Sequence, residues 1–281
     1  MSKKAHKNPS LALPVKLPAV AIITQDKGGD GKSLLAHIMS ERARMAGVAT
    51  GVVEVDSQGK SLSVLGPHVV SIAIDAKMMR RDPTAGLRSL TPLYETIAAT
   101  SKLGGLTIVE FGANESSRGA LWSAMLDLQE DIDALGAEVL VITPFTTQAE
   151  SMRRGAKSAQ SFLEALPRAH LVLVENQRDG AVADQHPASN SAEMYRSAIV
   201  PLAANAIMLR MPMIEAGCWR PFEARGVRLV EAVTMPVEDI MKLTGLPWPE
   251  AKINRHVVAG WAGEMFEEID KLIAFESEQD G

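Results

Sequence analysis

The sequence predicts an α/β fold, in which a mostly parallel, twisted sheet carries helices on both faces and extra helices follow at the C-terminus. Two observations lead to this prediction. Seven short apolar runs alternate with longer amphipathic stretches, and most of the runs are continuous, as expected for strands buried on both faces. After residue 217 this alternation gives way to helical periodicity alone. Strand–helix alternation implies right-handed crossovers and therefore a parallel sheet.

The elements follow in order along the chain. The expected strands are residues 19–24, 51–55, 69–74, 106–111, 138–143, 170–174 and 206–209. The clearest expected helices between them are residues 33–46, 118–135 and 147–166, and beyond the sheet 235–244 and 251–275. The last helix has its apolar residues at helical spacing, which favours packing on the sheet edge over binding to a membrane or a partner helix. Its acidic end also argues against an anionic membrane surface.

Composition limits the class of protein. The 281 residues have a formal net charge of −5 and are 46% hydrophobic, which is ordinary for a globular chain. A single cysteine, Cys218, excludes a disulfide framework and a cluster of thiolates. No apolar stretch approaches the roughly 18 residues of a membrane span. We therefore expect a cytoplasmic protein without a membrane association.

The chain divides into a short arm and one domain. Residues 1–18 contain four lysines and three prolines, which predicts a flexible basic arm, either a solubilising tail or a segment that contacts DNA. Residues 19–281 contain no repeat, low-complexity tract or clear linker, and we interpret them as a single domain.

One segment predicts a phosphate-binding site. An apolar strand from residue 19 runs through a glycine-rich turn into a helix that begins near Lys32. The glycines let backbone N–H groups face phosphate oxygens, and the helix N-terminus adds partial positive charge. Lys32 is expected to reach the β- and γ-phosphates, and the Ser33 hydroxyl to coordinate Mg²⁺. An ordinary glycine-rich turn is the alternative. The candidate cofactor-binding residues of this segment are Gly28, Gly29, Asp30, Gly31, Lys32, Ser33 and Leu34.

The run Lys27-Gly-Gly-Asp-Gly-Lys-Ser33 resembles the deviant Walker A pattern, KGGxGK[ST], of the ParA/MinD group of P-loop ATPases. The resemblance extends over residues 19 to about 230. It implies a P-loop NTPase-like sheet in a ParA-like ATPase domain that binds ATP and Mg²⁺. It also implies a homodimer formed on ATP binding, in which Lys27 reaches the partner's phosphates and stabilises charge during phosphoryl transfer. Asp30 departs from the family, because a carboxylate beside phosphates is repulsive unless it points away or pairs with a lysine or Mg²⁺.

Two carboxylates extend this resemblance. The run 51–59 is similar to the family's DxDPQ strand motif, which makes Asp56 the residue that orients the attacking water and a candidate Mg²⁺ ligand. Glu54 and Ser57 replace the first aspartate and the proline. Glu110 takes the place of the Walker B aspartate, which supports the Mg²⁺ shell. The alternatives are a turn-capping carboxylate for Asp56 and a helix-capping or ion-paired one for Glu110.

Two further segments resemble the family's base site. Asn176 ends an apolar run, at the place where the family has an asparagine that recognises adenine, and its amide has both a donor and an acceptor. An asparagine in an ordinary turn is the alternative. Residues 209–212 and 214–217 resemble the stretch that lines the base, and Arg210 is the candidate nucleotide contact there.

The resemblance implies an ATPase with Lys27, Lys32 and Asp56 as catalytic residues, slow and stimulated by a partner. A single cysteine excludes iron–sulfur members, two scattered tyrosines argue against autokinases, and the acidic C-terminus argues against membrane-bound division proteins. Plasmid or DNA partition is the first interpretation. The alternatives are an accessory protein of conjugative DNA transfer, and a nucleotide-binding regulator with weak catalysis, given the departures at positions 30, 54 and 110.

An ATPase of this kind is expected to bind DNA without sequence specificity, and to bind a centromere-binding or conjugation protein. Binding of this kind needs several basic residues in one patch, because phosphate neutralisation and counterion release drive it. Solvated helix faces are the alternative for each residue. The candidates are Arg153, Arg154, Lys157, Arg220, Arg225, Arg228, Lys252 and Arg255.

Overall fold

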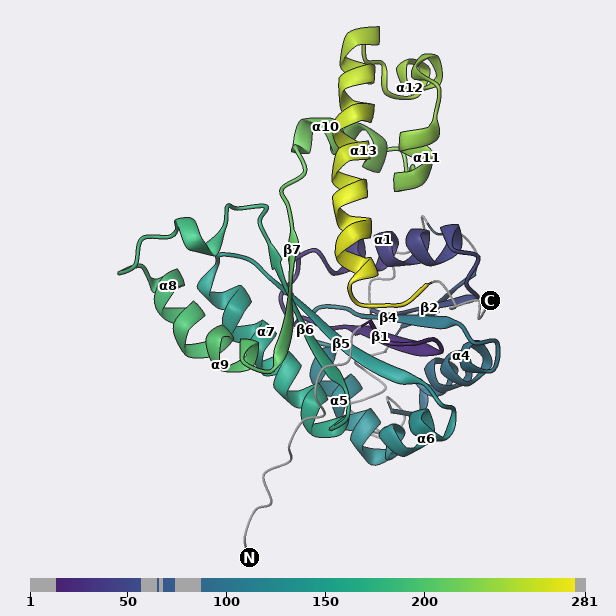
Figure 1. Cartoon of the computed structure of the whole chain (residues 1–281), viewed down its shortest axis with the longest axis vertical. Helices are drawn as coiled ribbons and strands as arrows, with labels where there is room; N and C mark the ends of the chain where they lie inside the picture. The colour runs from purple at the N-terminus through teal and green to yellow at the C-terminus, as the bar shows by residue number, and fades with distance from the viewer. Residues whose placement is uncertain (1–13, 57–64, 66–67, 74–86, 276–281) are drawn as a thin grey trace, which may run out of the picture.

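The computed structural model describes residues 14–56, 65, 68–73 and 87–275. Seven strands form one sheet, and every neighbouring pair in it is parallel (Figure 1). The order across the sheet is β3-β2-β4-β1-β5-β6-β7. The strands are β1 (Ala19–Ile23), β2 (Thr50–Val55), β3 (Val69–Ile72), β4 (Leu106–Phe111), β5 (Glu138–Phe145), β6 (His170–Asn176) and β7 (Ala206–Met211). The prediction of an α/β fold with a parallel sheet is thereby confirmed.

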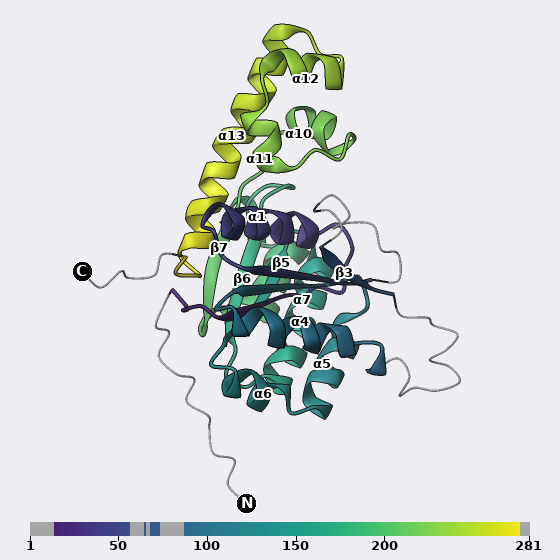
Figure 2. The same ribbon diagram turned by 90° about the vertical axis from the view of Figure 1, so that its right-hand side faces the viewer.

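Helices cover both faces of the sheet, and each face has its own apolar core (Figure 2). On one face lie α1 (Lys32–Met45) and the last helix, α13 (Trp248–Asp270). The other face is covered by α4 (Thr91–Lys102), α5 (Ser116–Met125), α6 (Leu128–Ala134) and α7 (Ala149–Ala165). Strands β1, β4 and β5 are buried along almost their whole length between these layers, which explains their continuous apolar sequences.

The helix predicted at residues 118–135 is wrong in one respect, because two helices occupy it. α5 ends at Met125 and α6 begins at Leu128. Between them Asp127 has a φ of 50°, in the left-handed region that an α-helix cannot continue through. The apolar periodicity continues across the break because both helices pack on the same face of the sheet.

The C-terminal helices form an extension beyond one end of the sheet (Figure 1). α10 (Ala216–Glu223), α11 (Leu229–Thr234) and α12 (Val237–Thr244) pack against α13, whose second half returns to α1. There Arg42 on α1 donates two hydrogen bonds to Asp270, at 2.7 and 3.1 Å. No helix in the described part of the chain is both long enough and apolar enough to cross a membrane.

The residues just before the sheet are packed on it. The Val15 side chain is fully buried, its N–H donates to the Leu272 carbonyl at 2.8 Å, and its carbonyl accepts from the Ala274 N–H at 2.9 Å. The Lys16 N–H donates to the Glu138 carboxylate at 2.8 Å. Most of the predicted basic arm, residues 1–13, lies outside the described residues, whereas its end at 14–18 is held between β5 and the C-terminal segment.

Candidate nucleotide site

The loop between β1 and α1 is fixed in shape by glycine. Gly29 has a φ of 79° and Gly31 a φ of 97°, both in the left-handed region that other residues rarely adopt. A Cβ on Gly31 would lie 2.5 Å from Met211 Cε and 2.7 Å from Asn176 Nδ2. The loop therefore lies directly against the ends of β6 and β7, and a Cβ at position 31 would force the Met211 and Asn176 side chains to shift.

Lys32, the first residue of α1, lies under this loop. Its ammonium donates to the carbonyls of Gln25, at 2.8 Å, and Lys27, at 3.1 Å. Burial lowers the pKa of Lys32, and the nearby carboxylates of Glu110, Asp30, Asp26 and Asp56 oppose that shift. A buried cation at a helix N-terminus is well placed to bind an anion, because both the charge and the helix dipole favour it.

Ser33 and Glu110 meet at the same end of the sheet. The Ser33 hydroxyl donates to the Glu110 carboxylate at 2.6 Å, and Glu110 itself is buried near the end of β4. Asp56, just after β2, packs against Gly112, where a Cβ would lie only 2.7 Å from its carboxyl carbon. These oxygen donors fit Mg²⁺, which takes one or two protein carboxylates and fills its shell with water and phosphate oxygens. The described residues contain no cluster of three His, Cys, Asp or Glu that could hold a metal by themselves.

Asp30 points away from the cavity, which resolves the repulsion that the sequence raises. Its carboxylate accepts from the Lys27 ammonium at 3.1 Å and from the Ser151 hydroxyl, in the first turn of α7, at 2.8 Å. Asp30 is buried, whereas Lys27 is partly exposed. In this state the Lys27 ammonium is bound within its own chain.

Asn176 is bonded to the loop directly through its amide nitrogen and indirectly, by way of Arg178, through its amide oxygen. Its Nδ2 donates to the Asp30 carbonyl at 3.0 Å, and its Oδ1 accepts from the Arg178 N–H at 3.1 Å. The Arg178 guanidinium in turn donates to the Gly29 carbonyl. Asn176 therefore holds the phosphate loop in place here, and contact with a base would require these bonds to be exchanged. The sequence did not point to Arg178, because an exposed arginine after a strand has no distinctive signal.

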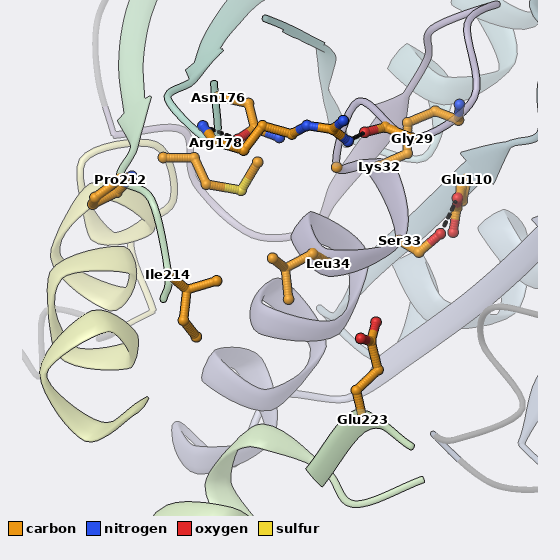
Figure 3. A pocket seen from close by; sticks show the side chains of 12 residues that line it. Gly29, Lys32, Ser33, Leu34, Glu110, Asn176, Arg178, Pro212, Ile214 and Glu223 are labelled. Atoms are coloured by element: carbon orange, nitrogen blue, oxygen red, sulfur yellow. Dashed lines mark hydrogen bonds between the residues drawn. The ribbon is translucent and has the colours of Figure 1, made fainter. Parts of the chain in front are cut away.

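A cavity of about 360 Å³ lies between the β1–α1 loop, the ends of the strands and the C-terminal extension (Figure 3). Its polar end contains Lys32, Ser33 and Glu110, and the other wall is largely apolar. Figure 3 shows Leu34 facing Ile214, with Pro212 beyond it, and a carboxylate from α10, Glu223, on the other side of Leu34. The lining residues are Gly29, Gly31, Lys32, Ser33, Leu34, Glu110, Asn176, Arg178, Met211, Pro212, Ile214 and Glu223.

Most of the candidate nucleotide contacts therefore gather around one cavity, but not all. Lys27, Gly28, Asp30 and Asp56 belong to the surrounding loops and are not part of the lining. Arg210 is exposed on β7, where its N–H donates to Glu268 at 3.1 Å, and it does not line the cavity either. Its neighbours Met211 and Pro212 do line the cavity, so the segment 209–212 contributes apolar residues to the site.

The candidate DNA contacts are only partly free. Arg153 and Arg154 both donate to Glu150, at 2.6 to 2.8 Å, and these hydrogen bonds lower the pKa of Glu150 to about 2. Arg228 pairs with Glu41 and Glu231, Arg255 donates to a backbone carbonyl, and the Lys252 ammonium lies over the Trp248 ring. The remaining three candidates are exposed: Lys157, Arg220 and Arg225.

No protein-family model and no curated protein matches the chain. Solved structures do. The MinC:MinD cell division complex of Aquifex aeolicus matches at 15% identity over 87% of this chain and 96% of its own, with a TM-score of 0.43. A plasmid partition protein of Borrelia burgdorferi matches at 10% identity over 70% and 90%, with a TM-score of 0.42. The ATP complex of Cyanothece McdA matches at 14% identity over 89% and 98%, with a TM-score of 0.41.

Identities of 10 to 16% and scores below 0.5 assign no activity to this chain.

Proposed function

We propose that this protein is an ATP-binding, slowly hydrolysing ATPase that dimerises with ATP and acts as a switch in plasmid or DNA partition. One observation carries the proposal. A glycine-rich loop, a buried lysine at a helix N-terminus and a serine hydroxyl 2.6 Å from a buried carboxylate line the same cavity. Backbone N–H groups and a lysine suit a polyphosphate, and a hydroxyl beside a carboxylate suits its metal ion.

The roles of the residues follow from this placement. Lys32 exchanges its two carbonyl partners for phosphate oxygens, which it attracts by full charge rather than by a dipole. Ser33 and Glu110 hold Mg²⁺, with Asp56 beside them. When bound, the metal neutralises charge on the phosphates. Asp56 orients the attacking water, since it is a carboxylate at the same edge of the sheet.

Dimerisation is the step that would complete the site. Lys27 is held by Asp30 in the single chain, so it contributes nothing to the cavity until that ion pair opens. In the ATP-bound dimer it reaches the partner's phosphates. Turnover is therefore expected to be slow in the single chain, because each active site depends on a lysine from a second copy.

The proposed ligands of the switch are DNA, bound without sequence specificity, and a centromere-binding protein. Exposed Lys157 and the two arginines of α7 supply the charge for phosphate contacts, without any base readout. Glu150 reduces that charge in the present state. DNA binding is therefore expected to be weak in the absence of ATP and strongly dependent on salt.

One observation favours a second candidate function, a nucleotide-binding regulator with weak hydrolysis. The Lys27–Asp30 ion pair is 3.1 Å long and Asp30 is also bonded to Ser151, so releasing Lys27 carries a cost that a small residue at position 30 would not impose. Turnover measured with and without DNA separates the two. A rate that DNA leaves unchanged favours the regulator.

Titration with a fluorescent ATP analogue tests the phosphate site. Lys32→Ala should abolish binding, because it removes the one lysine among the described residues of the lining. Lys102→Ala, an exposed lysine at the end of α4, is the matched control and should bind like the unaltered protein. Equal affinity in all three proteins would refute the assignment of the cavity.

A further inference from the structure

The C-terminal extension places one carboxylate in the nucleotide cavity. Glu223 is the last residue of α10, and it lines the cavity opposite the glycine-rich loop. Its carboxylate points toward Ser33 and Leu34 (Figure 3). It is exposed, and therefore open to a ligand.

Glu223 differs from the other ionisable residues of the lining. Lys32 is bonded to two carbonyls, Glu110 accepts from Ser33, and Arg178 donates to Gly29. Among the described residues Glu223 has no hydrogen bond or ion pair. Among the described ionisable residues of the lining, Glu223 is thus the one whose side chain remains available to a ligand.

The chemistry of a nucleotide decides which part of it this acceptor can meet. Triphosphate oxygens are acceptors and anions, so they repel a carboxylate. The donors of a nucleotide are its sugar hydroxyls and the exocyclic amine of its base. Glu110 is bonded to Ser33 at the proposed metal end, so a second carboxylate that does not bind the metal has to face the nucleoside part of the ligand.

The position of Glu223 within the cavity favours the sugar. Phosphates belong at the Lys32 and Ser33 end, and a planar base fits the apolar wall of Met211, Pro212 and Ile214. In Figure 3 Glu223 lies across Leu34 from Pro212 and Ile214, on the side of Ser33. The sugar joins base to phosphates, so it occupies the intervening part of the cavity.

We propose that Glu223 accepts hydrogen bonds from the ribose hydroxyls of the bound nucleotide, and that it makes the site selective for ribonucleotides over deoxyribonucleotides. This inference rests on the proposed nucleotide site. It also gives the extension a role in the site, because the carboxylate comes from α10 and not from the sheet.

The test compares binding of ATP, 2′-deoxy-ATP and 3′-deoxy-ATP by calorimetry. A hydrogen bond to a charged group is lost with each missing hydroxyl that Glu223 contacts, so the unaltered protein should bind at least one deoxy analogue about tenfold to a hundredfold more weakly than ATP. Glu223→Gln and Glu223→Ala should both still bind ATP; Glu223→Ala should bring that ratio close to one, and Glu223→Gln should reduce it, because its neutral amide oxygen accepts a weaker hydrogen bond. Glu264→Gln, an exposed glutamate within α13 that does not line the cavity, is the control and should keep the full ratio.

Three results would overturn the inference, and they differ in what they imply. An unchanged ratio in both Glu223 variants refutes the ribose contact and leaves the nucleotide site intact. If inosine triphosphate bound more weakly than ATP while the deoxy analogues bound as tightly as ATP, Glu223 would contact the exocyclic amine of the base and not the ribose. No binding of ATP by the unaltered protein would refute the proposed nucleotide site together with this inference.

Discussion

The three glycines of the phosphate loop allow a graded test of its shape. Gly28 is not in the left-handed region, and a Cβ there would meet nothing within 4 Å. Gly29 is left-handed, but its Cβ would reach only Arg178 Nη1, at an ordinary 3.4 Å. Gly31 is left-handed and its Cβ would meet Met211 and Asn176 at 2.5 and 2.7 Å. Alanine should therefore add no strain at position 28, backbone strain at position 29, and both backbone strain and a steric clash at position 31.

The magnitudes follow from these differences. A left-handed alanine costs roughly 1–2 kcal/mol relative to glycine. Overpacking at Gly31 adds about 1–3 kcal/mol, since Asn176 cannot move without losing its hydrogen bonds to the Asp30 carbonyl and the Arg178 N–H. We expect Gly31→Ala to lower the free energy of unfolding by about 2–5 kcal/mol. Gly29→Ala should lower it by about 1–2 kcal/mol. Gly28→Ala should change it by less than about 1 kcal/mol, in either direction.

Urea unfolding of the full chain, followed by circular dichroism and by tryptophan fluorescence, measures these free energies. Coincident transitions by the two probes and equal m-values among the variants are needed before the midpoints are compared. If Gly31→Ala were as stable as Gly28→Ala within about 0.5 kcal/mol, the described packing of the loop against β6 and β7 would be wrong.

Three further predictions concern the proposed switch. Lys27→Ala should remain monomeric with ATP in light scattering, because the cation that reaches the partner's phosphates is gone; nucleotide-induced dimers would remove that role. Asp56→Ala should dimerise with ATP but lose turnover in a phosphate-release assay, and normal turnover would assign the attacking water to another group. Glu150→Gln tests the arginine pair of α7. Hydrogen bonds from Arg153 and Arg154 hold the pKa of Glu150 near 2, against an ordinary 4.5. The ionised Glu150 carboxylate therefore stabilises the fold above pH 4.5, and this contribution disappears as the pH falls toward 2. The difference in melting temperature between Glu150→Gln and the unaltered protein should shrink over that range, and a difference independent of pH would contradict the assignment.

Local patterns predicted the elements well, and they failed where a single residue broke a pattern. The seven apolar runs correspond to the seven strands, because a strand buried on both faces has to be apolar throughout. The run at 118–135 was predicted as one helix, since apolar periodicity does not report the left-handed backbone at Asp127. The short helices around residues 182–203 lie in a stretch for which no helix was predicted.

For the candidate site, the sequence singled out the glycine-rich loop, Ser33 and Glu110, and the structure brings them around one cavity. Strand, glycines, lysine and helix are adjacent along the chain there, so their arrangement is local. Three features depended on the tertiary structure: the turning of Asp30 toward Ser151, the tie from Asn176 to the loop, and the entry of Glu223 from the extension. Each joins residues more than 100 positions apart, or places a distant helix over the cavity. Spacing along the sequence does not predict such contacts, because strand order and helix packing in the folded chain decide which distant side chains meet.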